Sequence, residues 1–499
     1  MSALKIAYIS PEVVPFAKTG GLADVAGALP KALVEMGNNV KVFMPLYSIT
    51  DRSKYGITCR EKNLNIDIAG KMQSFDLYHC RLNGSECDYY FINIAKYFYR
   101  DGMYVSSQSG KDWEDNDERF IAFSRAVLKS LMVLDMKPDI IHCNDWQTGL
   151  IPAYLKCSEG EYDYFKQSKT IFTIHNIAYQ GLFPAHSFYK LGIDRKWFYP
   201  TSGFEYYGKV SFLKAGLQFA DILTTVSEKY AEEIQSSPEY GYGMEGVLRE
   251  RSEDLYGVVN GIDYSIWDPA TDKLIKANYN FRNLEGKKRN KNALRRLTKL
   301  PLVHRDVPLI GVISRLTDQK GFDIFVEVAE QVFELDLQMV ILGTGDEKRE
   351  NQLKELARKY PKKLSVNIRF DNKLAHLIEA GADMFLMPSR YEPCGLNQLY
   401  SLKYGTVPIV RETGGLADTI ENCNPSKKTG TGFLFKNYDS WEFLNAIRFA
   451  MEVYKNKTVW KELMRRGMEK NFSWENSAVK YMRVYQKAMS KQDVGSRLI

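Results

Sequence analysis

The stretch KIAYISPEVVPFAKTGGLADVAGALPKALVEMGNNVKVFM, residues 5–44, contains the repeating unit from which this fold is built. It begins with a short apolar run at Lys5–Ser10 and ends with another at Val40–Met44, and both predict buried strands. Between them a glycine turn at Gly20-Gly21 leads into apolar positions with helical spacing. Strand, helix and strand in this order predict a parallel β-sheet covered by helices.

The helix predicted inside this stretch contains one residue that a helix tolerates poorly. Its apolar positions run from Leu22 to Met36, and Gly37 is typical of a helix end. Pro30 lies between them. Because proline lacks an N–H group and its ring clashes with the preceding turn, we expect a kink or an interruption there.

The same alternation continues along the chain. Further strands are expected at 139–143, 170–175, 222–226 and 257–259, with Ser227 as an N-cap before a helix. Residues 262–308 are rich in Asn, Lys and Asp and read as a connection with a lead-in helix. Alternation then resumes, with a helix at 322–333 and strands at 309–314, 338–342, 366–370, 384–387 and 407–410.

We therefore expect an α/β fold with two Rossmann-like, doubly wound parallel-sheet domains. Residues 1–261 would form the first domain and residues 262–473 the second. Residues 474–499 would add a C-terminal helix that packs back on the first domain. Ligands of such sheets bind outside the carboxyl ends of the strands, so we expect a cleft between the domains to hold the site.

Composition excludes several classes of protein. Of the 499 residues, 44% are hydrophobic and 26% are charged, which is typical of a globular enzyme. The net charge of +7 suits anionic small molecules and gives no basis for nucleic-acid binding. The densest basic stretch, within residues 287–296, reads as a solvated face. We expect no membrane span and no signal peptide, and hence a cytoplasmic protein.

Cysteine and histidine usage points to reduced thiols and to no metal site. The seven cysteines form no CxxC pair, and the six histidines form no HxxxH pair. No cofactor is expected from these patterns.

Two cations and a glutamate follow predicted strands of the second domain. Arg315 and Lys320 come after the strand at 309–314, across a turn that opens a helix, and such a pair suits a diphosphate. Glu392 follows the strand at 384–387 within SRYEPCGLN and would point to the same edge. Ordinary surface residues are the competing interpretation for each of them.

The first domain offers a matching set. Lys18 precedes the Gly20-Gly21 turn, where backbone N–H groups at a helix start can meet an anion. The string TGGLAD recurs after the strand at 407–410, so both domains carry a glycine turn into a helix. His175 lies at the end of a predicted strand, where a structural role and a functional role are both open.

The ordered motifs resemble the bacterial glycogen synthase and plant starch synthase family. They are KTGGLADV, HCNDWQTGL, TIHNIAYQG, YGYGMEGVL, VNGID, ISRLTDQKG, LAHLIEAGAD, SRYEPCGLNQLY and TGGLADT, and together they span nearly the whole chain. The resemblance implies the glycosyltransferase architecture called GT-B. It also implies transfer of glucose from ADP-glucose to the non-reducing end of an α-1,4-glucan such as glycogen, with retention of configuration and without a metal.

The resemblance also implies roles for individual residues. Arg315, Lys320, His175 and Glu392 would act on the diphosphate and the transferred glucose. The other donor positions would be Lys18, Gly20, Gly21, Gly395, Leu396, Asn397, Phe370 and Asn260. The acceptor glucan would meet Tyr99, Asp145 and Trp146, and Asp24 matches a cleft position of less defined role.

Some alternatives stay open on the sequence. UDP-glucose is an alternative donor. Sucrose synthase and glycogen phosphorylase share the architecture, although the motif set disfavours both. A catalytically silent glucan-binding protein would be expected to lose Arg315, Lys320 or Glu392, and this chain retains all three. The sequence leaves front-face attack and double displacement open, and we favour front-face attack.

Overall fold

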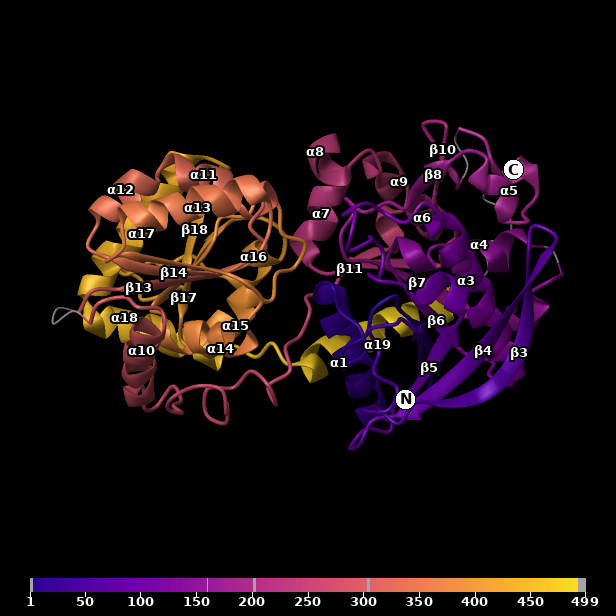
Figure 1. Ribbon diagram of the computed structural model, residues 1–499, viewed down its shortest axis with the longest axis horizontal. Helices are drawn as coiled ribbons and strands as arrows, with labels where there is room; N and C mark the ends of the chain where they lie inside the picture. Colours follow the sequence, from indigo (N-terminus) through magenta and orange to yellow (C-terminus); the bar gives the residue numbers. More distant parts are fainter. Residues whose placement is uncertain (1–2, 159, 201–202, 303–305, 492–499) are drawn as a thin grey trace. The chain divides into compact units, whose positions relative to one another are not determined.

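The structure is a computed structural model that describes residues 3–158, 160–200, 203–302 and 306–491. It divides into two compact units (Figure 1). Unit 1 comprises residues up to Val226, residues 231–261 and residues from Trp474 onward. Unit 2 comprises residues 227–230 and 262–473. Each unit is built around its own β-sheet.

The sheet of unit 1 has nine strands in the order β12-β11-β7-β6-β1-β2-β5-β4-β3. Neighbours from β12 to β5 pair in parallel, as predicted, and the sheet is extended by an antiparallel hairpin of β3 and β4 that the sequence analysis did not include. The strands are β1 (Lys5–Ile9), β2 (Asn39–Pro45), β3 (Thr58–Ile68), β4 (Lys71–Arg81), β5 (Asp88–Asn93), β6 (Ile140–Asn144), β7 (Lys169–Ile174), β11 (Ile222–Thr225) and β12 (Leu255–Gly257).

Helix α1 (Gly21–Glu35) begins at the predicted glycine turn and continues through Pro30. The expectation of an interruption there is therefore wrong. Pro30 is buried among the apolar residues of this helix, and their packing against the sheet supports the helix where proline removes a hydrogen bond. Helix α19 (Trp474–Ser490) packs against α1 and β7, so the C-terminal helix belongs to unit 1.

The remaining helices of unit 1 surround this sheet (Figure 1). They are α2 (Ala95–Phe98), α3 (Asn116–Val133), α4 (Leu150–Cys157), α5 (Ser187–Lys190), α6 (Phe212–Phe219), α8 (Pro238–Gly241) and α9 (Glu245–Glu250). A small antiparallel sheet contains β8 (Leu182–Pro184), β9 (Glu205–Tyr206) and β10 (Lys209–Ser211). At the start of α7 (Glu228–Ser236), the N–H of Tyr230 donates to Oγ of Ser227 at 3.0 Å, which confirms the predicted cap.

Unit 2 contains a six-stranded parallel sheet in the order β15-β14-β13-β16-β17-β18. Successive residues of one strand enter different cores: Leu386 packs in one cluster and Phe385 in another, which is typical of a sheet covered on both faces. The strands are β13 (Leu309–Ile313), β14 (Gln338–Gly343), β15 (Leu364–Ile368), β16 (Met384–Met387), β17 (Val407–Arg411) and β18 (Phe433–Phe435).

Helices flank both faces of this second sheet (Figure 1). They are α10 (Glu285–Leu297), α11 (Phe322–Glu327), α12 (Ala329–Glu334), α13 (Glu347–Lys359), α14 (Asn372–Gly381), α15 (Asn397–Lys403), α16 (Gly414–Thr419), α17 (Ser440–Lys455) and α18 (Lys457–Glu469). The single helix expected at 322–333 is two short helices that meet at Val328.

The expectation of a solvated face for the basic stretch of α10 is only partly correct, because Lys288, Arg289 and Arg296 are exposed but the other basic residues are buried. Lys287, Lys291 and Arg295 recur every fourth residue, and all three are buried on the inner side of the helix. The Lys287 ammonium donates to Oγ1 of Thr406 at 2.6 Å, and Lys291 pairs with Asp383 at 2.7 Å. Polar partners offset the cost of burying these charges. The four-residue spacing of the three basic side chains therefore identifies the face of α10 that packs against the rest of unit 2.

Candidate active site

The carboxyl ends of β13 and β16 form a topological switch point in unit 2, because the chain runs from β13 outward to β14 and β15 and then returns to the other side of β13. Ligands of open α/β sheets bind at such points. The loops after the two strands contact each other: the N–H of Arg390 donates to the carbonyl of Gln319 at 2.9 Å. Gly321 has φ 79°, and a Cβ there would lie 2.1 Å from the carbonyl oxygen of Pro388.

Lys320 and Glu392, predicted from separate motifs, meet at this switch point. Nζ of Lys320 lies 2.6 Å from Oε2 of Glu392, and the hydroxyl of Ser389 donates to the same oxygen at 2.9 Å. The Glu392 side chain is 7% exposed and that of Lys320 is 17% exposed. The carboxylate is therefore held by two donors and faces little water.

The second TGGLAD string packs against the Glu392 loop. The N–H of Gly415 donates to the carbonyl of Glu392 at 3.1 Å. A Cβ at Gly414, whose φ is 44°, would lie 2.0 Å from the same carbonyl oxygen. Glycine at this position thus lets the start of α16 approach the backbone that carries Glu392.

The other predicted donor groups of unit 2 surround the same strand ends. Arg315 is exposed, and its guanidinium donates to Oε1 of Gln319 at 2.9 Å. Gly395 has φ 73° in the turn before α15. The side-chain amide of Asn397, the first residue of α15, donates to the carbonyl of Ile313 at the end of β13. The turn at residues 395–397 is therefore anchored to β13.

Phe370 projects into solvent from a loop. It was expected at the end of a strand, but β15 ends at Ile368, and the Phe370 side chain is 87% exposed. The next residue, Asp371, caps α14 by accepting from the N–H of Leu374 at 2.9 Å. An aromatic ring on a well-capped loop is suited to stacking on a flat group such as a nucleotide base.

In unit 1 the switch point lies between β1 and β6, and the loops after β1, β6 and β7 carry Lys18, Asp145 and His175. Lys18 is about half exposed, and its ammonium lies 2.7 Å from Oδ1 of Asp24. Burial raises the pKa of Asp24, an effect that Lys18 partly offsets. Asp24, whose role the sequence left undefined, therefore directs the Lys18 side chain.

Glu12 is a site residue that the sequence analysis missed. It is buried and accepts from both the N–H and the hydroxyl of Thr19, each at 2.5 Å, and from the N–H of Gly20 at 3.3 Å. The hydroxyl of Tyr104 donates to it at 2.9 Å. Glu12 thus shapes the glycine turn, and the available signal was an acidic residue shortly after a buried strand.

His175 follows β7 and is a neutral hydrogen-bonding group. Its Nε2 lies 3.0 Å from Oδ1 of Asn144, and the amide of Asn144 donates to the carbonyl of Ile9 at 2.9 Å. The Asn144 oxygen must therefore accept, so Nε2 of His175 carries the proton and Nδ1 is left with a lone pair. Burial lowers the pKa of His175 to about 3, which keeps the ring uncharged near neutral pH.

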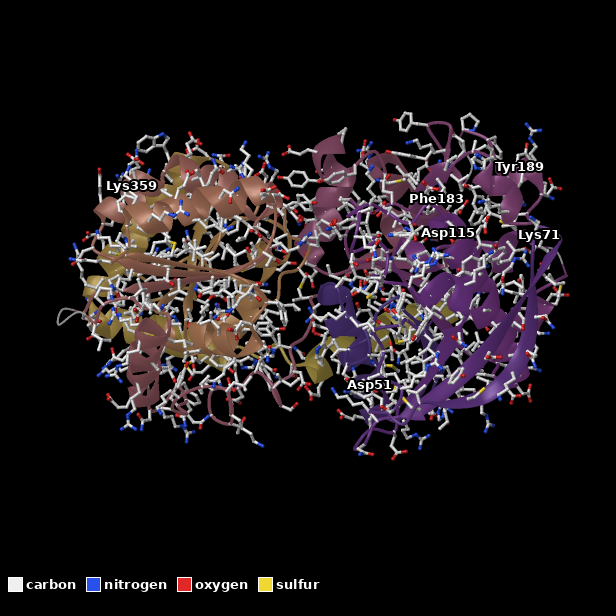
Figure 2. The ribbon with its side chains drawn as sticks, viewed as in Figure 1. Asp51, Lys71, Asp115, Phe183, Tyr189 and Lys359 are labelled. Carbon is white, nitrogen blue, oxygen red and sulfur yellow. The ribbon has the colours of Figure 1, made fainter. Side chains whose placement is uncertain are left out.

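Asp145 positions the backbone at His175. The N–H of His175 donates to Oδ1 of Asp145 at 2.7 Å, and Asp145 has φ 56°, a conformation that is rare outside glycine. Burial raises the pKa of Asp145 to about 7. The next residue, Trp146, packs against Phe183, which is labelled in Figure 2, with ring centroids 5.7 Å apart.

Among the described residues, no hydrogen bond or ion pair connects Tyr99 or Asn260 to the site residues above. Tyr99 is the C-cap residue that follows α2, and it is 67% exposed. Asn260 is 5% exposed, and its Oδ1 has no hydrogen-bond partner among the described residues. Both remain predicted ligand contacts.

Within the described ranges no helix is both long and apolar enough to cross a membrane. The same residues contain no group of three or more His, Cys, Asp or Glu side chains placed to hold a metal ion.

Comparisons with known proteins cover nearly the whole chain. Residues 5–250 match the family model described as starch synthase catalytic domain, and residues 300–466 match the one described as glycosyl transferases group 1. The glycogen synthase of Desulforudis audaxviator is 48% identical, with 98% of this chain and 97% of that protein covered. The glycogen synthase of Thermotoga maritima is 45% identical, with 98% and 99% covered.

A solved structure is similar over the same extent. The catalytic domain of starch synthase IV from Arabidopsis thaliana, bound to ADP and acarbose, superposes with a TM-score of 0.89 at 31% identity. The superposition covers 98% of this chain and 100% of the starch synthase IV chain.

Proposed function

Because the chain belongs to the glycogen synthase and starch synthase family, and so transfers glucose from a nucleotide sugar to an α-1,4-glucan with retention, we propose that its donor is ADP-glucose. The starch synthase IV neighbour was solved with ADP bound, which supports this choice over UDP-glucose. The glucan would grow at its non-reducing end.

The observation that carries the proposed site is the contact between Lys320 and Glu392 at the switch point of unit 2. As the glycosidic bond breaks, negative charge grows on the leaving diphosphate. Lys320 and Arg315 would stabilise that charge, with the turn at residues 395–397 beside them. Glu392 would hold the transferred glucose, and Phe370 would stack on the base of the nucleotide.

The groups of unit 1 would serve the same donor and the acceptor. Lys18, at the glycine turn, would add a cation for the diphosphate. His175 is neutral with its proton on Nε2, so we propose that Nδ1 accepts a hydrogen bond from a glucose hydroxyl. Oδ1 of Asn260, which has no hydrogen-bond partner among the described residues, would accept a hydrogen bond from the sugar nucleotide. Tyr99, Asp145 and Trp146 would bind the acceptor glucan.

We propose front-face attack for the chemical step. The acceptor hydroxyl would attack from the side that the diphosphate leaves, and the departing phosphate oxygen would take the proton. This route needs no carboxylate nucleophile on the opposite face of the sugar. It also assigns to Lys320 and Arg315 the charge stabilisation that a metal supplies in other transferases, so addition of EDTA is expected to leave the rate unchanged.

The proposed cellular location is the cytoplasm. Among the described residues none of the seven cysteines forms a disulfide, which suits a reducing compartment. Cell fractionation with an antibody to the protein would test this assignment.

The donor is tested by initial rates with ADP-[14C]glucose and UDP-[14C]glucose at matched concentrations, with glycogen as acceptor. Label in the precipitated polymer is expected mainly from ADP-glucose, and β-amylase should release it if the new bonds are α-1,4 links at non-reducing ends. Glu392→Ala serves as the inactive control. Preferential use of UDP-glucose would overturn the donor assignment, and absence of label with both donors would overturn the transfer function.

A further inference from the structure

Arg411 is a buried cation beside the proposed donor loops. It ends β17 and is 6% exposed. Its Nε donates to the carbonyl of Ser389 at 2.9 Å, and its terminal nitrogens donate to the carbonyl of Arg390 and, at 3.3 Å, to that of Lys436. One guanidinium thus serves backbone oxygens of two separate loops.

The carbonyl that Nε of Arg411 holds belongs to a residue that also holds Glu392. Ser389 is 1% exposed, and its hydroxyl donates to Oε2 of Glu392 at 2.9 Å. Lys320 contacts the same carboxylate oxygen. The connection from Arg411 to the carboxylate therefore passes through the backbone and the side chain of Ser389.

The position of Arg411 in the sheet explains why an arginine is needed. Met387 pairs with Val410, so Arg411 lies one residue past the last pair of β16 and β17. Beyond that point the backbone of residues 388–390 has left the ladder, and the carbonyls of Ser389 and Arg390 need other donors. A planar guanidinium supplies several N–H groups in fixed directions, and its charge strengthens each bond.

We propose that Arg411 is a positioning residue for glucosyl transfer. It fixes the backbone of Ser389 and Arg390, so that the Ser389 hydroxyl sets the direction of the Glu392 carboxylate. This inference rests on the proposed role of Glu392 at the donor glucose. Arg411 itself touches neither the glucose nor the diphosphate in this scheme.

The test compares Arg411→Met, Arg411→Lys, Ser389→Ala and the double variant Arg411→Met/Ser389→Ala. Loss of a hydrogen bond to a charged group predicts a fall in kcat of roughly 10- to 100-fold for Arg411→Met, with the KM for glycogen unchanged. Because both residues act through the Glu392 carboxylate, kcat of the double variant should be only slightly lower than kcat of Arg411→Met. Arg411→Lys should recover part of the loss.

The matched control is Arg295→Met. Arg295 is also buried, and its guanidinium donates to the carbonyl of Val307 at 2.8 Å and to Oε1 of Gln338 at 2.7 Å, before β13 and at the start of β14. The control should lower the Tm while kcat of the folded protein stays within about twofold of the wild type. Hydrogen–deuterium exchange of residues 388–396 gives a readout independent of turnover, and it should accelerate in Arg411→Met but not in the control.

The outcomes separate this inference from the proposed function. If residues 388–396 exchange at the wild-type rate in both Arg411 variants, or if the losses in kcat multiply in the double variant, Arg411 has no positioning role. If the wild-type protein transfers glucose from neither donor, the proposed function fails, and the exchange experiment still decides the positioning role. If Arg411→Met does not fold, Arg411→Lys and Ser389→Ala carry the same comparison.

Discussion

The ammonium of Lys320 and the carboxylate of Glu392 form an ion pair at 2.6 Å, although the two residues lie on loops that follow different strands. A carboxylate with so little access to water is costly to bury unless a positive charge pairs with it. Lys320 therefore has two tasks: it balances Glu392, and in the proposed reaction it also stabilises the leaving diphosphate. Arg315 is exposed, and in the proposed reaction it stabilises the same diphosphate.

We expect Lys320→Ala and Arg315→Ala to lower kcat/KM by about 2–4 kcal/mol each, or roughly 30- to 900-fold, because each removes a charge-assisted contact to the leaving group. Lys320→Ala should also lower the Tm, because it leaves Glu392 buried without a counter-ion. Initial rates and thermal denaturation measure both effects.

The control for this pair is Lys359→Ala. Lys359 is an exposed lysine at the end of α13, paired with Glu330 and labelled in Figure 2. Neither its kcat/KM nor its Tm should change appreciably. Near-normal turnover in Lys320→Ala or Arg315→Ala would remove that residue from the proposed site.

Glu392→Ala should nearly abolish transfer and leave the fold intact. Lys320 and Ser389 hold the carboxylate in place, and alanine has no oxygen that could bind the glucose. The fold should persist because the Lys320 side chain is exposed enough to be hydrated once Glu392 is removed. Circular dichroism and polymer labelling would be compared, with Glu392→Gln as the shape-matched variant. Substantial transfer by Glu392→Ala would contradict the assigned role.

Glu12→Gln should weaken the glycine turn of unit 1. Both carboxylate oxygens of Glu12 accept from donors, and glutamine replaces one oxygen with an NH₂ group that cannot accept. We expect a loss in kcat/KM of about tenfold or more from the misplaced turn. Tyr104→Phe removes only one of the hydrogen-bond donors to Glu12, so it should lower kcat/KM less than Glu12→Gln does. Equal activity of Glu12→Gln and wild type would show that the turn needs no such anchor.

The sequence predicted the fold where strands are buried on both faces. The strand at 384–387 has the predicted bounds because its apolar run is continuous and ends at Pro388. The β3–β4 hairpin was missed because it lies at the sheet edge, where many side chains face water and the apolar signal is broken. Tertiary packing also overrode the local signal of Pro30 in α1.

The sequence predicted which residues gather at the strand ends but not how they are held. Lys320 and Glu392 meet as expected of motifs that follow neighbouring strands. The anchors Glu12 and Arg411 escaped notice because each acts through hydrogen bonds to backbone far away in sequence, and no local pattern marks such bonds. The roles of the individual site residues stay predictions until the variants are measured.

Phe370→Ala should weaken donor binding more than it slows the chemical step. An exposed ring that stacks on a base contributes about 1–3 kcal/mol, which predicts a rise in the donor KM of roughly 5- to 150-fold. Phe370→Tyr should retain wild-type affinity. Trp441→Ala is the control, because Trp441 is an exposed aromatic residue of α17. It should leave the donor KM and kcat unchanged. A donor KM unaffected by Phe370→Ala would place the base elsewhere.

A buried carboxyl far from the donor loops predicts a pH-dependent stability. Glu379, in α14, is 0% exposed and accepts from the Ser401 hydroxyl at 2.7 Å. Its Oε1 has no hydrogen-bond partner among the described residues, and burial raises its pKa to about 8. Lys287 is the charged group that opposes this rise, and burial lowers the pKa of Lys287 to about 7.

The sign follows from proton binding. Between the ordinary pKa of a glutamate and the raised value, the folded protein binds a proton at Glu379 that the unfolded chain has released, so this residue costs more stability as the pH rises. Glu379→Gln has no such proton, and its amide oxygen can still accept from Ser401. The variant should therefore match the wild type near about pH 5 and exceed it by about 2–4 kcal/mol near about pH 8.

Urea unfolding across this pH range would measure the difference, with Glu355→Gln as the control at an exposed glutamate of α13. The control should show no trend with pH, because its side chain faces water in the folded protein as it does in the unfolded chain. A gain for Glu379→Gln that is equal at all pH values would show that Glu379 is ionised in the folded protein.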